Sequence, residues 1–78
     1  MQGRLGYNSD NDRYGVLAAA DWLYEGFHCG EPLEVLIDGA WVQSRMEMKF
    51  GENGGVWYLV GTPYEGKDLE YLTVCIRE

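Results

Sequence analysis

The most reactive side chains of the sequence lie next to each other, at His28 and Cys29. An imidazole and a thiolate together could bind a metal ion, or the imidazole could activate the thiol as a nucleophile. A structural zinc site needs four ligands, however, and no third and fourth ligand follow at a recognisable spacing. Neighbouring residues of a strand also point to opposite sides. The sequence therefore predicts a histidine at a strand entrance that bonds to the backbone, with neither a metal site nor a catalytic thiol.

A second candidate is the polar stretch 8–12, in which oxygen-bearing side chains alternate as they do in a calcium loop: Asn8, Asp10 and Asp12. The full loop requires a glycine at its sixth position and a glutamate at its twelfth, and here Arg13 and Ala19 occupy these positions. We therefore expect a plain turn. No glycine-rich phosphate loop and no distinct pair of catalytic carboxylates occur elsewhere, so we expect no cofactor and no enzymatic activity.

The 78 residues carry a net charge of −7, with 13 acidic and 6 basic residues. This charge argues against nucleic-acid binding, which needs clustered Lys and Arg. No apolar run approaches the length of a membrane span and no secretion signal is recognised, so a single cytoplasmic domain over 1–78 is expected. In that compartment Cys29 and Cys75 are expected to be free thiols.

The elements that must position any site centre on residues 29–61. Asp38-Gly39 between two apolar runs predicts a two-residue type I′ turn, which would pair Ile37 with Ala40 and Leu36 with Trp41. Alternation then places one set of side chains on the core face: Leu33, Val35, Ile37, Ala40 and Val42. The other, half-exposed face carries Leu36, Trp41, Glu34 and Gln43.

A second hairpin is expected over 46–60, in one of two registers. A turn at Asn53-Gly54 would pair Phe50 with Trp57, and would bury Met46, Met48, Phe50, Trp57 and Leu59. A five-residue loop over 51–55 would slip the pairing by one residue and bury Tyr58 and Val60 instead. The first register is preferred because it buries a tryptophan and keeps the charged residues together.

The remaining chain predicts a hairpin over 2–17, with Leu5 and Tyr7 on one face of its first strand, and a last strand over 72–77, with Leu72, Val74 and Ile76 inward. Residues 18–25 have helical propensity and predict at most one short helix, or else an irregular loop. Residues 62–68 predict a loop. The fold class is all-β, a five- or six-stranded SH3-like barrel or a strongly bent antiparallel sheet.

The aromatic residues are the strongest functional signal, because a core of this size cannot bury all of Trp22, Tyr24, Trp41, Tyr58, Tyr64 and Tyr71. Exposed Trp and Tyr are typical of recognition surfaces, although they also cover the outer faces of sheets without binding anything. The predicted binding residues are Trp22, Tyr24, Leu36, Trp41 and Tyr64.

The stretch Gly30-Glu-Pro-Leu-Glu-Val-Leu, followed by a turn, Trp41 and Arg45, resembles the centre of an SH3 domain. Trp22-Leu-Tyr-Glu25 is faintly similar to the Ala-Leu-Tyr-Asp-Tyr segment of that family. The resemblance covers about 22–45, and the Pro-Ser-x-Tyr stretch of the family is replaced here by Thr62-Pro-Tyr-Glu65. It implies an SH3-like barrel with Tyr24 and Trp41 in the ligand groove.

A broader resemblance rests on Arg13-Tyr-Gly-Val, His28-Cys-Gly-Glu-Pro-Leu-Glu-Val, Trp41-Val-x-x-Arg-Met-Glu47, Trp57-Tyr-Leu-Val and Leu72-Thr-Val-x-Ile-Arg77. These segments are similar to a family of short uncharacterised proteins, a domain of unknown function, of Gram-positive bacteria and their mobile elements. The resemblance implies no activity. Its signature positions here are 28–31 and Trp41.

The function is therefore unknown from sequence, and three hypotheses remain. The first is a non-catalytic module that binds a protein partner through an acidic, aromatic surface. The second is a homodimer assembled through edge strands. The third is a DNA-mimicking inhibitor of a nucleic-acid enzyme, which would use the scattered acids Asp10, Asp12, Glu31, Glu34, Glu47, Glu65, Asp68 and Glu70.

Overall fold

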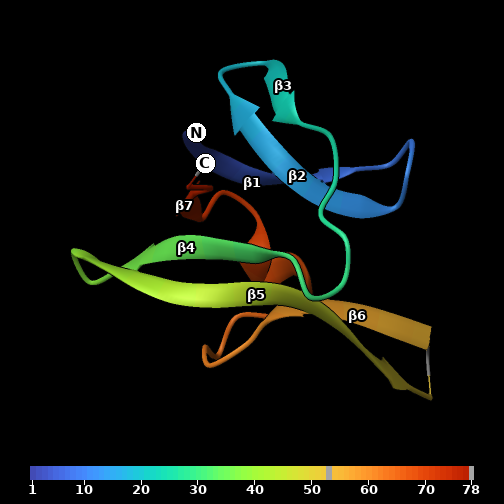
Figure 1. Cartoon of the computed structure of the whole chain (residues 1–78). Coiled ribbons are helices and arrows are strands. Elements are labelled where there is room, and N and C mark those ends of the chain that lie inside the picture. The colour runs from blue at the N-terminus through green and yellow to red at the C-terminus, as the bar shows by residue number, and fades with distance from the viewer. Residues whose placement is uncertain (53, 78) are drawn as a thin grey trace.

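The computed structural model describes every residue except Asn53 and Glu78. It forms one antiparallel sheet of seven strands in the order β3-β2-β1-β7-β4-β5-β6 (Figure 1). The strands are β1 Gln2–Asn8, β2 Arg13–Ala18, β3 Asp21–Tyr24, β4 Pro32–Ile37, β5 Ala40–Gly51, β6 Gly54–Leu59 and β7 Thr73–Cys75. The all-β class is confirmed. The predicted strand count of five or six is wrong, and the SH3-like barrel is not confirmed because the sheet is open, with β3 and β6 at its edges.

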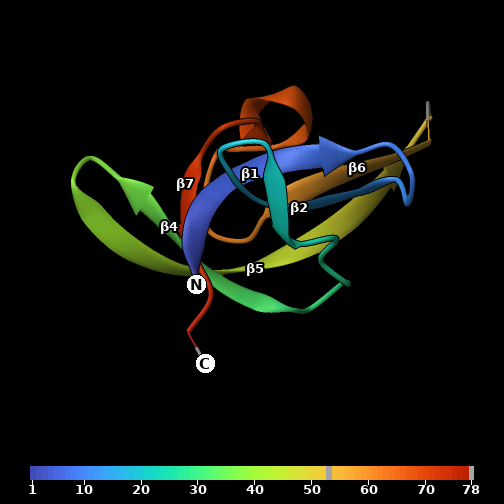
Figure 2. The same ribbon diagram turned by 90° about the horizontal axis from the view of Figure 1, so that it is seen from above.

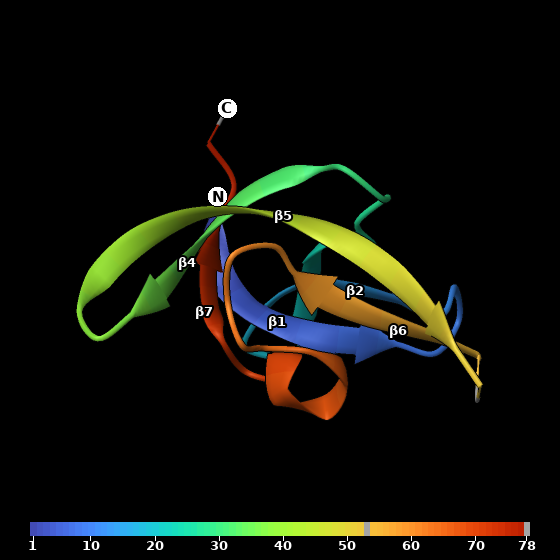
Figure 3. The same ribbon diagram turned by 90° about the horizontal axis from the view of Figure 1, so that it is seen from below.

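Two three-stranded meanders, β1–β3 and β4–β6, are joined by the short strand β7 between β1 and β4. Figures 1, 2 and 3 show that the sheet bends so that the two meanders face each other. The indole Nε1 of Trp57 donates to the carbonyl of Asp12 at 3.0 Å, and the Tyr14 hydroxyl donates to the carbonyl of Gly66 at 3.0 Å. The core fills the space between the meanders: Leu5, Tyr14, Val16, Phe27, Leu33, Val35, Met46, Trp57, Leu59, Leu69 and Val74.

The first predicted meander turn is confirmed. Asp38 and Gly39 have φ of +50° and +80°, as a type I′ turn requires, and Ile37 lies opposite Ala40. The pairing continues through Leu36–Trp41 and Leu33–Ser44, as predicted. The core face is also as predicted except at Ala40, which is exposed because the hairpin extends past the core there.

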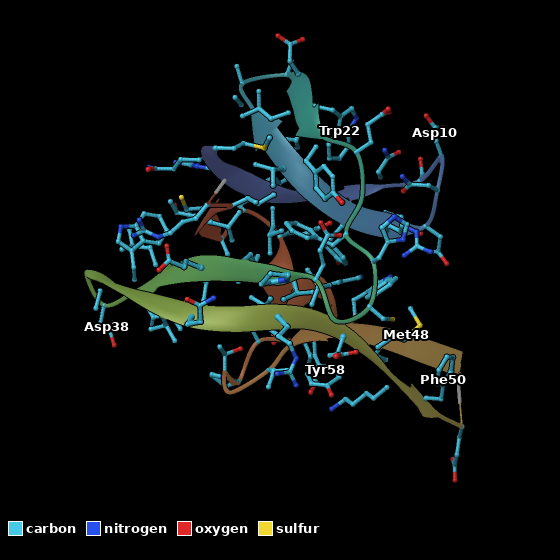
Figure 4. The ribbon with its side chains drawn as sticks, viewed as in Figure 1. Asp10, Trp22, Asp38, Met48, Phe50 and Tyr58 are labelled. Atoms are coloured by element: carbon cyan, nitrogen blue, oxygen red, sulfur yellow. The ribbon has the colours of Figure 1, made fainter. Side chains whose placement is uncertain are left out.

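The register of the second hairpin is wrong by two residues. Met48 lies opposite Trp57 and Phe50 opposite Gly55, and the preferred turn includes Asn53, which lies outside the described residues. A shift of two residues keeps every side chain on its face, so Trp57 and Leu59 are buried as expected. Phe50 is corrected from buried to 81 % exposed, because it lies beyond the core near the far end of β5 (Figure 4).

The predicted short helix over 18–25 is wrong. Ala18 pairs with Asp21 across the two-residue turn Ala19-Ala20, and Asp21–Tyr24 form the edge strand β3. So short a segment has little helical stability by itself. Pairing with β2 satisfies its backbone instead and lays the Trp22 indole over Gly6, where an added Cβ would lie 3.5 Å from the ring.

The terminal segments largely follow the predictions. The hairpin of β1 and β2 is confirmed, with Leu5 fully buried, although Tyr7 is 43 % exposed and packs edge-on against Tyr14. β7 is shorter than the predicted strand 72–77 but buries Val74 as expected. The predicted loop over 62–68 contains the start of a 3₁₀ turn, η1 Gly66–Leu69, which buries Leu69. None of the described helical residues form a helix long and apolar enough to cross a membrane.

Candidate binding face

The side of the sheet that faces away from the core carries a row of side chains that crosses most of the strands. On the first meander Trp22 lies opposite Leu17, Leu17 opposite Arg4, and Arg4 opposite Thr73 of β7. We call the outer face the set Trp22, Leu17, Arg4, Thr73, Leu36 and Trp41. Its members come from six strands, β1 to β5 and β7.

The second meander continues the row through the pair Leu36 and Trp41. Cys75 of β7 lies opposite Glu34 of β4. Thr73 is two residues from Cys75 on β7, and Leu36 is two residues from Glu34 on β4. Because side chains alternate along a strand, all four lie on the same face of the sheet. Trp22, Leu36 and Trp41 are 36 %, 36 % and 38 % exposed. The outer face thus presents Leu36 and Trp41 side by side on the second meander and Trp22 on the first, and the bend of the sheet turns the outer sides of the two meanders away from each other (Figure 1).

Trp22 and Tyr24, which were predicted together, lie on opposite faces. Between the pairs Leu17–Trp22 and Val16–Tyr24, β2 advances by one residue and β3 by two, so Leu23 is the extra residue of a β-bulge. The bulge turns Trp22 outward and directs Tyr24 to the side of fully buried Val16. Tyr24 and Trp41 therefore do not form the common groove that the SH3 resemblance implies.

Tyr24 is held by contacts within the chain. Its hydroxyl donates to the two carboxylate oxygens of Glu31 at 2.6 and 2.8 Å, and its ring packs edge-on against Phe27 at 5.1 Å between centroids. The Glu31 carboxylate also accepts the backbone N–H of His28 at 2.9 Å. Tyr24 therefore fastens the connection between β3 and β4.

The hydrogen bond to Glu31, together with burial, raises the pKa of Tyr24 from 10.0 to about 12. Below pH 10 the phenol is protonated in both the folded and the unfolded chain, and its stabilising contribution is complete. Between pH 10 and about 12 the unfolded chain releases a proton that the folded chain keeps, so the free energy of unfolding falls as pH rises. We expect Tyr24→Phe to remove this part of the alkaline loss.

Urea unfolding of wild type and Tyr24→Phe at a series of alkaline pH values measures this effect. The difference in stability between the two proteins should shrink as pH rises from 10 to 12. Tyr7 and Tyr14 also have raised pKa values, and they are common to both proteins. A difference that stays constant with pH would contradict the role of the Tyr24–Glu31 hydrogen bond.

Tyr64 also lies away from the outer face. It is half-buried against the core, its N–H donates to Thr62 Oγ1 at 3.1 Å, and its carbonyl accepts the N–H of Leu59 at 3.2 Å. Of the five predicted binding residues, the structure therefore brings Trp22, Leu36 and Trp41 onto one face, and places Tyr24 and Tyr64 elsewhere.

The residues with potential for covalent or metal chemistry remain apart. His28 and Cys29 are exposed, Cys75 is half-buried, and both cysteines are free. Among the residues that the structure describes, no three His, Cys, Asp or Glu side chains gather as a metal site would require.

A family model described as Domain of unknown function (DUF5348) matches residues 3–76. The chain belongs to this family. No curated protein and no solved structure matches the chain. The description assigns no function to DUF5348, and the match spans β1 to β7, so it includes both meanders of the outer face.

The structure of this DUF5348 domain adds a groove that the sequence did not reveal. It has a volume of about 460 Å³ and is lined by Gly3, Arg4, Leu17, Ala18, Ala19 and Tyr71. Tyr71 is 67 % exposed and has a φ of +69°, a strained conformation for a residue with a side chain. Leu17 and Arg4 are shared with the outer face. Only the excess of aromatic residues could have drawn attention to Tyr71, since its strain is a property of the fold.

Proposed function

We propose that this DUF5348 domain is a non-catalytic protein-binding domain and that the outer face is its binding surface. One observation carries the proposal: Leu36 and Trp41 lie opposite each other on the outer face, and each exposes more than a third of its surface. Exposed tryptophans on a firm scaffold are frequent centres of protein interfaces, because they bury much apolar area at little entropic cost.

The charges around the outer face bear on the kind of partner that it would bind. The Glu34 carboxylate is paired with the Arg77 guanidinium, and a shallow groove of about 170 Å³ lies beside them. Among the described residues Arg4 makes no ion pair. The overall charge of −7 favours a partner with a basic surface around an apolar patch.

Affinity capture with the immobilised domain tests this proposal. A lysate of a Gram-positive bacterium is the first choice, since the resemblance of the sequence implies that origin. Wild type should retain a specific protein, and Trp41→Ala should weaken that retention by at least about tenfold, the usual effect of losing a central aromatic anchor.

The matched control is Phe50→Ala, which removes an aromatic side chain that is more exposed but lies off the outer face. Retention by this variant should equal that of wild type. If Trp41→Ala, shown by circular dichroism to be folded, retains the same proteins as Phe50→Ala, the outer face is not the binding surface. Retention that falls with added salt would indicate a basic partner.

A further inference from the structure

Strand β5 has an edge that no other part of the described chain covers. β5 has 12 residues, whereas each of its neighbours has six. β4 pairs with its first half, from Ala40 to Arg45, and β6 with its second half, from Met46 to Gly51. The side of Ala40–Ser44 that would continue the line of β6 is therefore open, on an arm that projects beyond the rest of the molecule (Figures 1 and 3).

The backbone groups of Trp41 and Gln43 point to this open side. The pair Ile37–Ala40 closes a two-residue turn, so Ala40, Val42 and Ser44 direct their N–H and C=O groups to β4. The N–H and C=O groups of the intervening residues Trp41 and Gln43 therefore point away from β4. Two further hydrogen bonds confirm this phase: the N–H of Met46 donates to Glu31 beside β4, and the carbonyl of Arg45 accepts the N–H of Val60 on the other side.

The open edge also lacks the features by which sheets protect their edges. Ala40, Trp41, Val42, Gln43 and Ser44 include no charged residue and no proline, and the pairing with β4 has no bulge. The other two edges are protected. β3 is only four residues long, begins with Asp21 and contains a bulge, and β6 is bridged at Tyr58 by Glu65.

We infer that the Ala40–Ser44 edge pairs with the same edge of a second copy of this chain, giving a two-fold symmetric dimer. Two copies of this edge can pair antiparallel to each other, with Val42 on the two-fold axis. In this arrangement the outward backbone groups of Trp41 and Gln43 meet those of the second copy. Trp41 then lies opposite the partner's Gln43, and each of these two pairs exchanges both backbone hydrogen bonds.

Charge favours a second copy over a basic partner at this edge. Copies that each carry a charge of −7 can pair only where acidic residues do not meet, and Ala40–Ser44 is uncharged. A basic strand would instead need carboxylates beside the edge.

Pairing would also join the outer faces of the two copies, because Trp41 and the partner's Gln43 lie on the same side of the combined sheet. This inference goes beyond the proposed function and does not depend on it. A dimer can form without a further partner, and the outer face of a monomer can bind one.

Sedimentation equilibrium of the whole domain at several concentrations tests the dimer, with Gln43→Pro as the decisive variant. Proline removes an N–H that the fold does not use, and edge strands tolerate it at such positions. Each dimer would lose two backbone hydrogen bonds, so the association constant should fall by about thirtyfold or more. Gln43→Ala keeps the N–H and should associate like wild type.

Hydrogen exchange of the wild-type amides supplies a readout that requires no variant. The Trp41 and Gln43 amides should exchange more slowly as the protein concentration rises, whereas the Trp22 amide on edge strand β3 should not change. A wild type that remains monomeric would overturn the inference. So would a dimer in which these two amides exchange freely, or one that a folded Gln43→Pro variant still forms.

Discussion

Replacing Phe27 with alanine is expected to remove a large part of the free energy of unfolding of the protein. Phe27 is fully buried although it lies in the connection between β3 and β4, outside any strand. Its N–H donates to the Tyr14 carbonyl at 2.8 Å, and its own carbonyl accepts Arg13 Nη1 at 2.9 Å. The connection is thus fastened to β2, and the Phe27 ring is part of the core.

The size of the effect follows from the size of the domain. Truncating a buried phenylalanine to alanine costs about 3–5 kcal/mol. A domain of this length has a total stability of about 4–12 kcal/mol. Urea unfolding followed by tryptophan fluorescence measures the loss directly.

His28→Ala is the matched control for Phe27→Ala, because it changes an exposed ring at the next position of the same connection. Its unfolding midpoint should stay close to that of wild type. A Phe27→Ala variant with a midpoint as high as that of His28→Ala would show that the connection does not contribute to the core.

Replacing Gly15 with alanine is expected to be the second most damaging change. A Cβ at Gly15 would overlap the carbonyl oxygen of Tyr24 and lie 2.9 Å from the carbonyl carbon of Glu25. These are backbone atoms, and the Glu25 carbonyl is fixed by amide donors from Asn8 at 3.0 Å and Asn11 at 2.9 Å. The connection would have to move away from β2, at a cost of about 3 kcal/mol.

Thermal unfolding of Gly15→Ala beside Gly51→Ala separates this clash from the general effect of adding a methyl group to a strand. A Cβ at Gly51 meets nothing within 4 Å, and this glycine also lies in a strand. Gly51→Ala should therefore unfold near the wild-type temperature. Equal melting temperatures for the two variants would mean that the crossing at Gly15 is looser than the structure indicates.

The sequence predicted local features of the fold more successfully than distant ones. Asp38-Gly39 specifies its own turn through the positive φ of both residues, and a turn of known length fixes every pair that follows. The β5–β6 register was missed because the sequence Gly51-Glu-Asn-Gly-Gly55 is compatible with several turns, although the alternation of side chains still predicted the buried face. The helical propensity of the alanines led to the prediction of a short helix over 18–25. The structure has strand β3 there instead, because pairing with β2 outweighs that propensity.

The candidate site could be predicted only in part, for a similar reason. Leu36 and Trp41 are opposed across a turn that the sequence specifies, so their pairing was predictable. Trp22 joins them because β7 lies between the meanders, and Tyr24 is separated from Trp22 by a bulge. The order of strands that are distant in the sequence cannot be recognised from the pattern of residues in so short a chain. The same is true of a bulge made by one extra residue.

The position of β7 has a consequence for how the chain is made. A ribosome releases the residues of β1–β3 first and those of β4–β6 next, and each meander can assemble from neighbouring strands as it emerges. The strand that holds the two meanders together comes from residues 73–75 and pairs with both β1 and β4. The nascent chain therefore carries two unjoined half-sheets with exposed apolar faces until residues 73–75 have emerged. Such exposed apolar faces and unpaired strand edges promote aggregation during that interval.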